Sequence, residues 1–206
     1  TKEESAQKPD LVVIFGNDDG NDATNFYYDE ANDIWVGCIS DNPRIEYFGY
    51  LKKMCLTLHN LAQMKKGWLP IHGAFVNIYL KDGTKKGIML MGDSGAGKSE
   101  SIEALKAAAG DMIREVEVVF DDMGTIHLED GVPYGQGTEI GAFIRLDDLD
   151  PGTPYRDMDR SIFMAPENPN SRMIQPAAPY RVVVHNHKID LFAYANNYTN
   201  EFGLKK

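Results

Sequence analysis

The sequence predicts a mixed α/β fold of the α+β kind that is rich in strands. Short apolar or alternating runs bounded by turn residues recur along the chain, as strands do. Two segments instead carry apolar residues at helical spacing or are rich in helix formers. The chain has 206 residues, of which 43% are hydrophobic, so it can bury a core of ordinary size.

The N-terminal part predicts one strand, one loop and one long helix. The run "LVVIFG" at 11–16 predicts a strand, and the polar run "NDDGNDATN" after it predicts an exposed loop. This loop does not match a calcium-binding loop, because Gly20 would place the first ligand position on Phe15. An amphipathic helix is predicted within 47–67 and ends at Gly67. Its apolar positions are Leu51, Met54, Cys55, Leu58, Leu61 and Ala62.

The middle of the chain predicts a hairpin, a helix and a further strand. The runs at 72–80 and 87–92 predict two strands joined by the turn "KDGTKK". The run at 99–110 predicts a helix that Gly110 caps, and 115–122 predicts the next strand.

Near the C-terminus, the run at 180–194 predicts a hairpin or two adjoining strands. His185 and His187 would then share one strand face as hydrated residues at a turn, because no further ligands for a zinc site stand near them.

Charge and cysteine usage narrow the class of partner. A formal net charge of -10 argues against nonspecific binding to nucleic acid or to anionic membranes, since both need clustered cations. No window approaches 18 consecutive apolar residues, and the first ten residues lack the apolar core of a signal peptide. Cys38 and Cys55 stand in unrelated contexts, which favours free thiols and a cytoplasmic protein. We therefore expect small-molecule ligands; the oligomeric state is not predicted.

A glycine-rich run between a predicted strand and a predicted helix carries the main functional signal. Gly92, Gly97, Lys98 and Ser99 fit the P-loop pattern Gly-x4-Gly-Lys-Ser/Thr. Glycines let backbone N–H groups converge on a phosphate, the helix start adds unpaired donors, and the lysine brings a full charge to the outer phosphates. The residues expected to contact a nucleotide are Gly92, Asp93, Ser94, Gly95, Ala96, Gly97, Lys98, Ser99 and Glu100.

Two acidic residues predict a metal ion beside these phosphates. Asp121 and Asp122 are expected to end a strand, where P-loop enzymes place a metal-binding aspartate, and the Ser99 hydroxyl can ligate Mg²⁺. A solvated turn would show the same letters. The motif predicts ATP with a divalent metal, but it is shared by kinases, ATPases, GTPases and carboxykinases.

The segment before the P-loop resembles that of ATP-dependent phosphoenolpyruvate carboxykinases. In that family a Tyr-x-Gly-x-x-Lys-Lys run is followed, nineteen residues after its second lysine, by a histidine; here these residues are Tyr47, Lys53 and His72. The resemblance implies that Lys53, His72 and Asp122 bind a transition metal, usually Mn²⁺, and that Tyr47 lies near phosphoenolpyruvate. A lysine ligand requires a deprotonated amine. The alternatives are an exposed helix charge for Lys53 and a core or strand-edge histidine for His72.

Two later segments resemble the same family more loosely. "GTEIGAF" at 137–143 implies that Glu139 lies near the nucleotide and metal, and "NPNSRMIQPAAPY" implies that Arg172 reaches the substrate and the transferred phosphoryl group. A guanidinium suits that role because it is planar, permanently charged and bidentate. A surface charge is the alternative for Arg172, and Arg156, Arg160 and Arg181 are nearby competitors.

The resemblance implies a fold, an organisation and a reaction. We expect a strand-rich nucleotide-binding lobe of the phosphoenolpyruvate carboxykinase/HPr kinase type: a single domain over 1–206, belonging to a longer chain, with an N-terminal extension at 1–43 and a P-loop core at 44–206. The reaction implied is ATP- and metal-dependent conversion of oxaloacetate to phosphoenolpyruvate, with Lys98, Asp121 and Arg172 assisting phosphoryl transfer.

Two alternatives stay open. The letters "GDSGAGKSE" and "HGAFVNIY" also resemble HPr kinase/phosphorylase, which implies a serine kinase, although the loop that accompanies its seryl substrate has no counterpart here. A noncatalytic nucleotide-sensing module is the third hypothesis.

Overall fold

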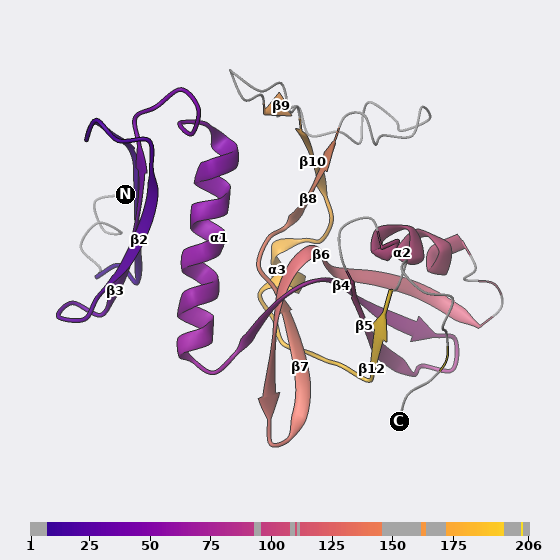
Figure 1. Ribbon diagram of the computed structural model, residues 1–206. Coiled ribbons are helices and arrows are strands. Elements are labelled where there is room, and N and C mark those ends of the chain that lie inside the picture. The colour runs from indigo at the N-terminus through magenta and orange to yellow at the C-terminus, as the bar shows by residue number, and fades with distance from the viewer. Residues whose placement is uncertain are drawn as a thin grey trace. The chain divides into compact units, whose positions relative to one another are not determined.

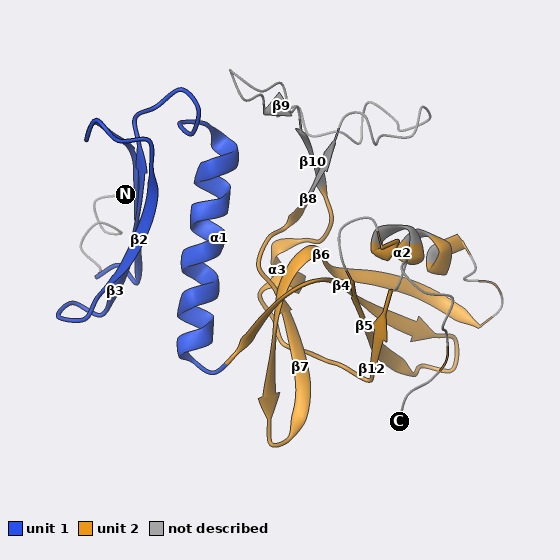
Figure 2. Cartoon of the chain, viewed as in Figure 1, with its two compact units in different colours: residues 1–67, 143–175 blue, residues 68–142, 176–206 orange. Residues whose placement is uncertain are grey.

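The computed structural model divides the chain into two compact units (Figures 1 and 2). The structure describes residues 8–92, 96–107, 110, 112–145, 162–163, 172–195 and 203. Unit 1 comprises Thr1–Gly67 and Phe143–Gln175, and unit 2 comprises Trp68–Ala142 and Pro176–Lys206. The mixed, strand-rich fold class is confirmed, whereas its P-loop carboxykinase type stays a prediction.

Unit 1 contains a three-stranded sheet covered by one helix. Strand β3 (Ile34–Ser40) lies between β1 (Leu11–Asn17), parallel to it, and β2 (Thr24–Asp29), antiparallel to it. The helix α1 (Phe48–Lys65) packs Met54 and Leu58 against this sheet, as the periodicity predicts. Cys55, expected on the apolar face of this helix, is exposed.

No helix in the described part of the chain is long and apolar enough to cross a membrane.

Unit 2 is built on a six-stranded sheet, whose order is β11-β7-β6-β4-β5-β12. The predicted hairpin is confirmed, since β4 and β5 pair antiparallel across a turn at Gly83, where φ is 89°. The strands of this sheet are β4 (Leu69–Leu80), β5 (Lys85–Met91), β6 (Ile113–Glu129), β7 (Val132–Gly137), β11 (His187–Lys188) and β12 (Leu191–Tyr194).

Both faces of this sheet bury apolar side chains. One face carries Ala74, Val76 and Leu90, which pack with Ile102 of the helix α2 (Lys98–Ala107); we call it the α2 face. The opposite face buries Phe75 and Phe120 with other apolar residues. Successive residues of a strand alternate between faces, so the face of each polar residue in β4 follows from these neighbours.

The prediction of a hairpin over 180–194 is wrong. Residues Tyr180–Val183 form the short helix α3, β11 pairs with β7, and β12 pairs in parallel with β5. Pro179 precedes this helix and has extended backbone angles. Val182 and Val183 are buried, so packing overrides the β-preference of valine.

Three further strands, β8 (Gly141–Arg145), β9 (Ile162–Phe163) and β10 (Arg172–Pro176), form a small sheet in the order β8-β10-β9.

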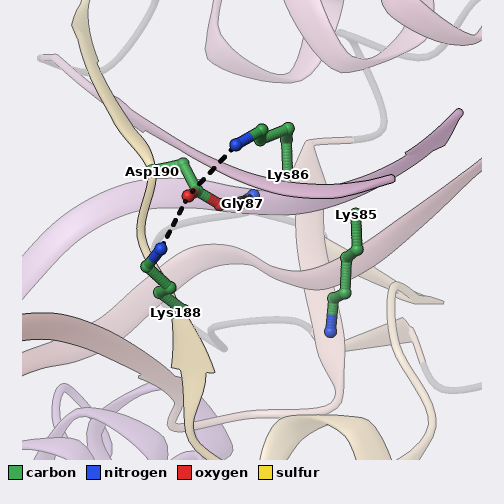
Figure 3. Close-up of a pocket in the computed structure, with 5 residues that line it drawn as sticks. All are labelled: Lys85, Lys86, Gly87, Lys188 and Asp190. Carbon is green, nitrogen blue, oxygen red and sulfur yellow. Dashed lines mark hydrogen bonds and ion pairs between the residues drawn. The ribbon is translucent and has the colours of Figure 1, made fainter. Parts of the chain in front are cut away.

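Asp190 fastens the segment before β12 to the start of β5 (Figure 3). Its Oδ2 accepts a hydrogen bond from the Gly87 amide at 2.9 Å, which is the main reason why the pKa of Asp190 is lowered. Its Oδ1 lies 3.1 Å from Lys188 Nζ and 3.7 Å from Lys86 Nζ. These residues and Lys85 line a pocket of about 200 Å³, in which Lys86 and Lys188 point at Asp190 and Lys85 points away.

A buried polar network joins β4, β6 and β11. Asn77 is fully buried, and its Nδ2 donates to Glu117 Oε2 and to His187 Nδ1, both at 2.9 Å. His187 Nε2 donates to the Val182 carbonyl at 2.8 Å. His187 is therefore a neutral imidazole protonated at Nε2, not the hydrated residue that the sequence predicts, and burial lowers its pKa. The charged or titratable groups around it are Glu117, Lys85 and His185.

This network predicts that the protein loses stability in mild acid. Below pH ~6.5 an unfolded histidine binds a proton that His187 in the folded chain does not, so this residue lowers the free energy of unfolding by up to about 1.4 kcal/mol per pH unit. The loss continues as the pH falls toward the lowered pKa of His187. Urea denaturation at pH 7.5, 6.5 and 5.5 should therefore show a steeper decline for the wild type than for His187→Gln. His185→Gln, at an exposed position, is the control; because His185 has the smallest effect on the pKa of His187 among the surrounding groups, its decline should stay closer to that of the wild type than to that of His187→Gln. Equal slopes for the wild type and His187→Gln would contradict the prediction.

Candidate phosphate and metal site

The described residues of the phosphate loop join β5 to α2 in the order that the P-loop motif predicts. Gly92 follows β5, and Gly97 precedes Lys98, the first residue of α2. Lys98 is buried, with 6% of its surface exposed, and its Nζ donates to the Gly92 carbonyl at 2.9 Å. The ammonium group of this first helical residue thus contacts Gly92, the first residue of the loop, which we call the loop root.

The backbone at the two glycines suits a bound polyphosphate. Gly97 has a φ of 87°, and a Cβ added there would meet nothing within 4 Å, so the space beside it is open. A Cβ on Gly92 would lie only 2.7 Å from the Ala195 carbonyl oxygen, so only glycine fits. The first amides of α2 have no acceptor within the helix, and Lys98 adds a cation beside them. These donors fit phosphate oxygens.

The second part of the site is a pair of side chains on β4 and β6. His72 Nε2 lies 2.9 Å from Asp122 Oδ1, and both side chains are about 40% exposed, at 42% and 39%. His72 is on the α2 face, because it stands two residues before Ala74. The pair is therefore open to solvent on the same face as the helix that follows the phosphate loop.

A backbone distortion directs Asp122 to this pair. Regular alternation would place Asp122 on the face opposite Asp121, which shares the α2 face with its cross-strand partner Ala74. Asp122 instead has a φ of 120°, which is rare for a residue with a side chain, and its carboxylate reaches His72. Strained residues of this kind cluster at functional sites. The side chains of Asp121 and Asp122 can therefore lie on the same face of the sheet, although the two residues are adjacent in β6.

The sheet register brings the pair next to the phosphate loop. Gly73 of β4 is paired with Asp122 of β6 on one side and with Met91 of β5 on the other. Adjacent strands lie about 4.8 Å apart, so the backbone of Asp122 is about 10 Å from that of Met91, the last residue of β5 before the loop. This juxtaposition lies entirely within unit 2.

The spacing of the pair fits two neighbouring ligands of an octahedral ion. Two ligands bound at about 2.1 Å are about 3.0 Å apart when they meet at 90° and about 3.4 Å apart at the tetrahedral angle. The observed 2.9 Å is the length of an ordinary hydrogen bond between the two side chains, and it is also close to the octahedral edge that Mg²⁺ and Mn²⁺ prefer. Binding through Nε2 requires His72 to carry its proton on Nδ1. Among the described residues, no three His, Cys, Asp or Glu side chains form a group that could hold a metal ion.

The expectation that a strand ends at the two aspartates is wrong. β6 continues to Glu129, and Asp121 and Asp122 lie near its middle, paired with β4. The letters "DDMG" are typical of a turn, but the strand extends because Gly124, Thr125 and Ile126 pair with β7. The carboxylates are consequently held in a strand by their pairing with β4, and the pairing with β7 begins two residues after Asp122.

Several predicted contact residues fall partly or wholly outside the described residues. Asp93, Ser94 and Gly95 lie outside them. Ser99 and Glu100 belong to α2, but their side chains lie outside them as well. Ala96 is buried, and Glu139 is half-buried between β7 and β8. Their contacts with a nucleotide stay predictions.

The remaining predicted site residues belong to unit 1. Tyr47 precedes α1 and packs edge-on against Tyr50, and Lys53 is an exposed residue of α1 whose Nζ lies 5.3 Å from the Tyr50 ring centroid. Arg172 begins β10, opposite Phe163, and its side chain lies outside the described residues. Their roles beside the unit 2 residues stay predictions.

Two residues that position the site are absent from the sequence prediction. Gly73 lets β4 and β5 approach closely beside the pair, since a Cβ there would lie 2.7 Å from the Leu90 carbonyl oxygen. A glycine inside the strand pattern "HGAFVNIY" is a signal of such an approach. Ala195, which contacts the loop root, has no comparable signal.

Comparison with known proteins leaves the family unassigned. No protein-family model matches the chain, and no curated protein matches it. The resemblance to carboxykinases rests on the motifs alone.

The strained backbone at Asp122 predicts an inverted preference for glycine. At ordinary strand positions glycine is about 0.5–1 kcal/mol less favourable than alanine. At residue 122 both substitutions remove the carboxylate, but only glycine accepts a φ of 120° without strain, which costs about 1–3 kcal/mol. Asp122→Gly should therefore unfold at a higher urea concentration than Asp122→Ala. The control pair is Leu128→Gly and Leu128→Ala, at an exposed position of the same strand, where alanine should be the more stable. The same order at both positions would show that residue 122 is unstrained.

Proposed function

We propose that this chain holds ATP and a divalent cation for a phosphoenolpyruvate carboxykinase-like phosphoryl transfer. The observation that carries the proposal is the His72–Asp122 pair, whose atoms are 2.9 Å apart, one strand away from the root of a P-loop. A P-loop alone supports any nucleotide enzyme. A cation held by the solvent-open His72–Asp122 pair would favour a reaction that needs a cation on the substrate as well as on the phosphates.

The phosphate end of the reaction is assigned to the loop. Lys98 would exchange the Gly92 carbonyl for the outer phosphate oxygens of ATP and offset their charge. Asp121, on the α2 face by its pairing with Ala74, is proposed to hold the Mg²⁺ of the nucleotide together with Ser99.

The substrate end is assigned to His72 and Asp122. These two side chains would hold a divalent cation, which would supply Lewis-acid stabilisation of the oxaloacetate carbonyl and of the enolate. The carboxylate of oxaloacetate leaves as CO₂ and its electron pair stays on the enolate. The enolate oxygen then bonds to the γ-phosphorus while the bond to the bridging oxygen breaks, which yields phosphoenolpyruvate and ADP. His72 and Asp122 would orient the cation.

A serine kinase of the HPr kinase type is the second candidate. The same 2.9 Å contact would let Asp122, backed by His72, accept a hydroxyl proton while ATP is attacked. The two candidates differ in product, because only the kinase leaves a stable phosphomonoester on a hydroxyl.

Product analysis with site variants tests the proposal. The protein is incubated with ATP, oxaloacetate, MgCl₂ and MnCl₂, and phosphoenolpyruvate is followed by ³¹P NMR. Lys98→Met should weaken ATP binding by about tenfold or more, since the variant lacks the positive charge beside the phosphates. It should leave Mn²⁺ binding unchanged, because Lys98 is not part of the His72–Asp122 pair. His72→Gln and Asp122→Asn should weaken Mn²⁺ binding and lower the rate by about 100-fold or more.

One control variant and three outcomes separate the proposed function from its alternatives. His185→Gln, which removes an exposed histidine outside the pair, should behave like the wild type. ATP and Mn²⁺ bound tightly without phosphoenolpyruvate would overturn the carboxykinase proposal. Phosphorylation of added seryl peptides would then favour the kinase, and neither product would favour the sensing module.

A further inference from the structure

A strand from the C-terminal part of the chain ends beside the first glycine of the phosphate loop. β12 runs parallel to β5 in the register Leu191 with Ile88 to Tyr194 with Met91. The Ala195 amide then donates to the Met91 carbonyl at 2.7 Å. Residue 195 therefore lies next to Gly92, where β5 ends and the loop begins.

Three small residues meet at this point without spare room. A Cβ placed on Gly92 would lie 2.7 Å from the Ala195 carbonyl oxygen, 3.2 Å from Ala195 Cβ and 3.0 Å from Ala96 Cβ. Distances below 3.4 Å are tighter than ordinary carbon contacts. Ala96 is itself buried. Gly92 therefore has no room for a methyl group between Ala96 and Ala195, and the Ala195 side chain is one wall of this contact.

The same contact reaches the lysine of the loop. The peptide between Met91 and Gly92 is held on one side by the Ala195 amide, and the Gly92 carbonyl accepts from Lys98 Nζ at 2.9 Å. A shift of Gly92 would therefore move the group that positions the Lys98 ammonium. Interiors pack densely enough that a displaced side chain moves its neighbours.

We propose that Ala195 is a positioning residue for the phosphate loop. This inference rests on the proposed function, because it assigns residue 195 to the polyphosphate part of the site. A small side chain at 195 leaves Gly92 and Ala96 where they are. A larger one displaces the loop root and Ala96, and so weakens binding of the ATP phosphates through Lys98. The His72–Asp122 pair is on other strands and keeps its geometry.

The test separates ATP binding from metal binding and from folding. ATP affinity is measured by titration calorimetry, Mn²⁺ affinity by electron paramagnetic resonance, and stability by thermal unfolding. Ala195→Leu and the milder Ala195→Val should weaken ATP binding, by about tenfold or more for leucine, as overpacked contacts do. Mn²⁺ affinity should stay within about twofold of the wild type. Ala195→Gly, which adds no volume, should bind ATP nearly as the wild type does.

Two further variants distinguish positioning from loss of β12. Ala193→Val enlarges a residue that packs on the α2 face, so it should lower the unfolding temperature while the folded protein keeps its ATP affinity. Ala96→Gly removes one wall of the contact, so valine at 195 should weaken ATP binding less in that background than in the wild type.

The outcomes separate this inference from the proposed function. Wild-type ATP affinity in Ala195→Val and Ala195→Leu overturns the inference alone, and so does an equal loss of ATP and Mn²⁺ binding. If Ala195→Leu does not fold, Ala195→Val decides. A wild-type protein that binds no ATP, or binds it equally well as Lys98→Met, overturns the proposed function and the role of Ala195 with it.

Discussion

The geometry of the candidate site depends on one strand being held between two others. β4 pairs with β5 on one side and with β6 on the other, and Gly73 is the residue opposite both Met91 and Asp122. A Cβ on Gly73 would lie only 2.7 Å from the Leu90 carbonyl oxygen, so glycine lets β4 and β5 come this close. The distance between the phosphate loop and the His72–Asp122 pair is therefore set by backbone pairing. Hydrogen-bonded ladders hold such a distance better than loops do.

Local patterns predicted the elements, and tertiary contacts decided where prediction failed. The helix over 47–67 and the hairpin before the P-loop follow from periodicity and turn residues, and both are confirmed. The segment at 180–183 is helical because its valines are buried beneath the sheet, which no local pattern shows. β6 passes the turn-like letters at 121–124 because β4 and β7 pair with it there.

Only those site residues whose side chains can bind a ligand or take part in a reaction could be predicted from the sequence. The resemblance named His72, Asp122 and Lys53 as ligands of one ion; the side chains of His72 and Asp122 do lie together, while the ion and the role of Lys53 stay predictions. The φ of 120° at Asp122 was not predictable, because a residue with a side chain rarely adopts such an angle. Ala195 was not predictable either, since an alanine offers neither charge nor a hydrogen-bonding side chain.

The position of Asp121 and Asp122 in the middle of β6 limits how such a site can change during evolution. Loops accept insertions and deletions readily, so an acid at a strand end can be moved by altering a loop. Within β6, a gain or loss of one residue would slip the register and turn every following side chain to the other face, Thr125 and Ile126 among them. The core would be lost together with the carboxylates. Variation at this site is therefore confined to substitution, and homologues should keep a constant number of residues between Phe120 and His127.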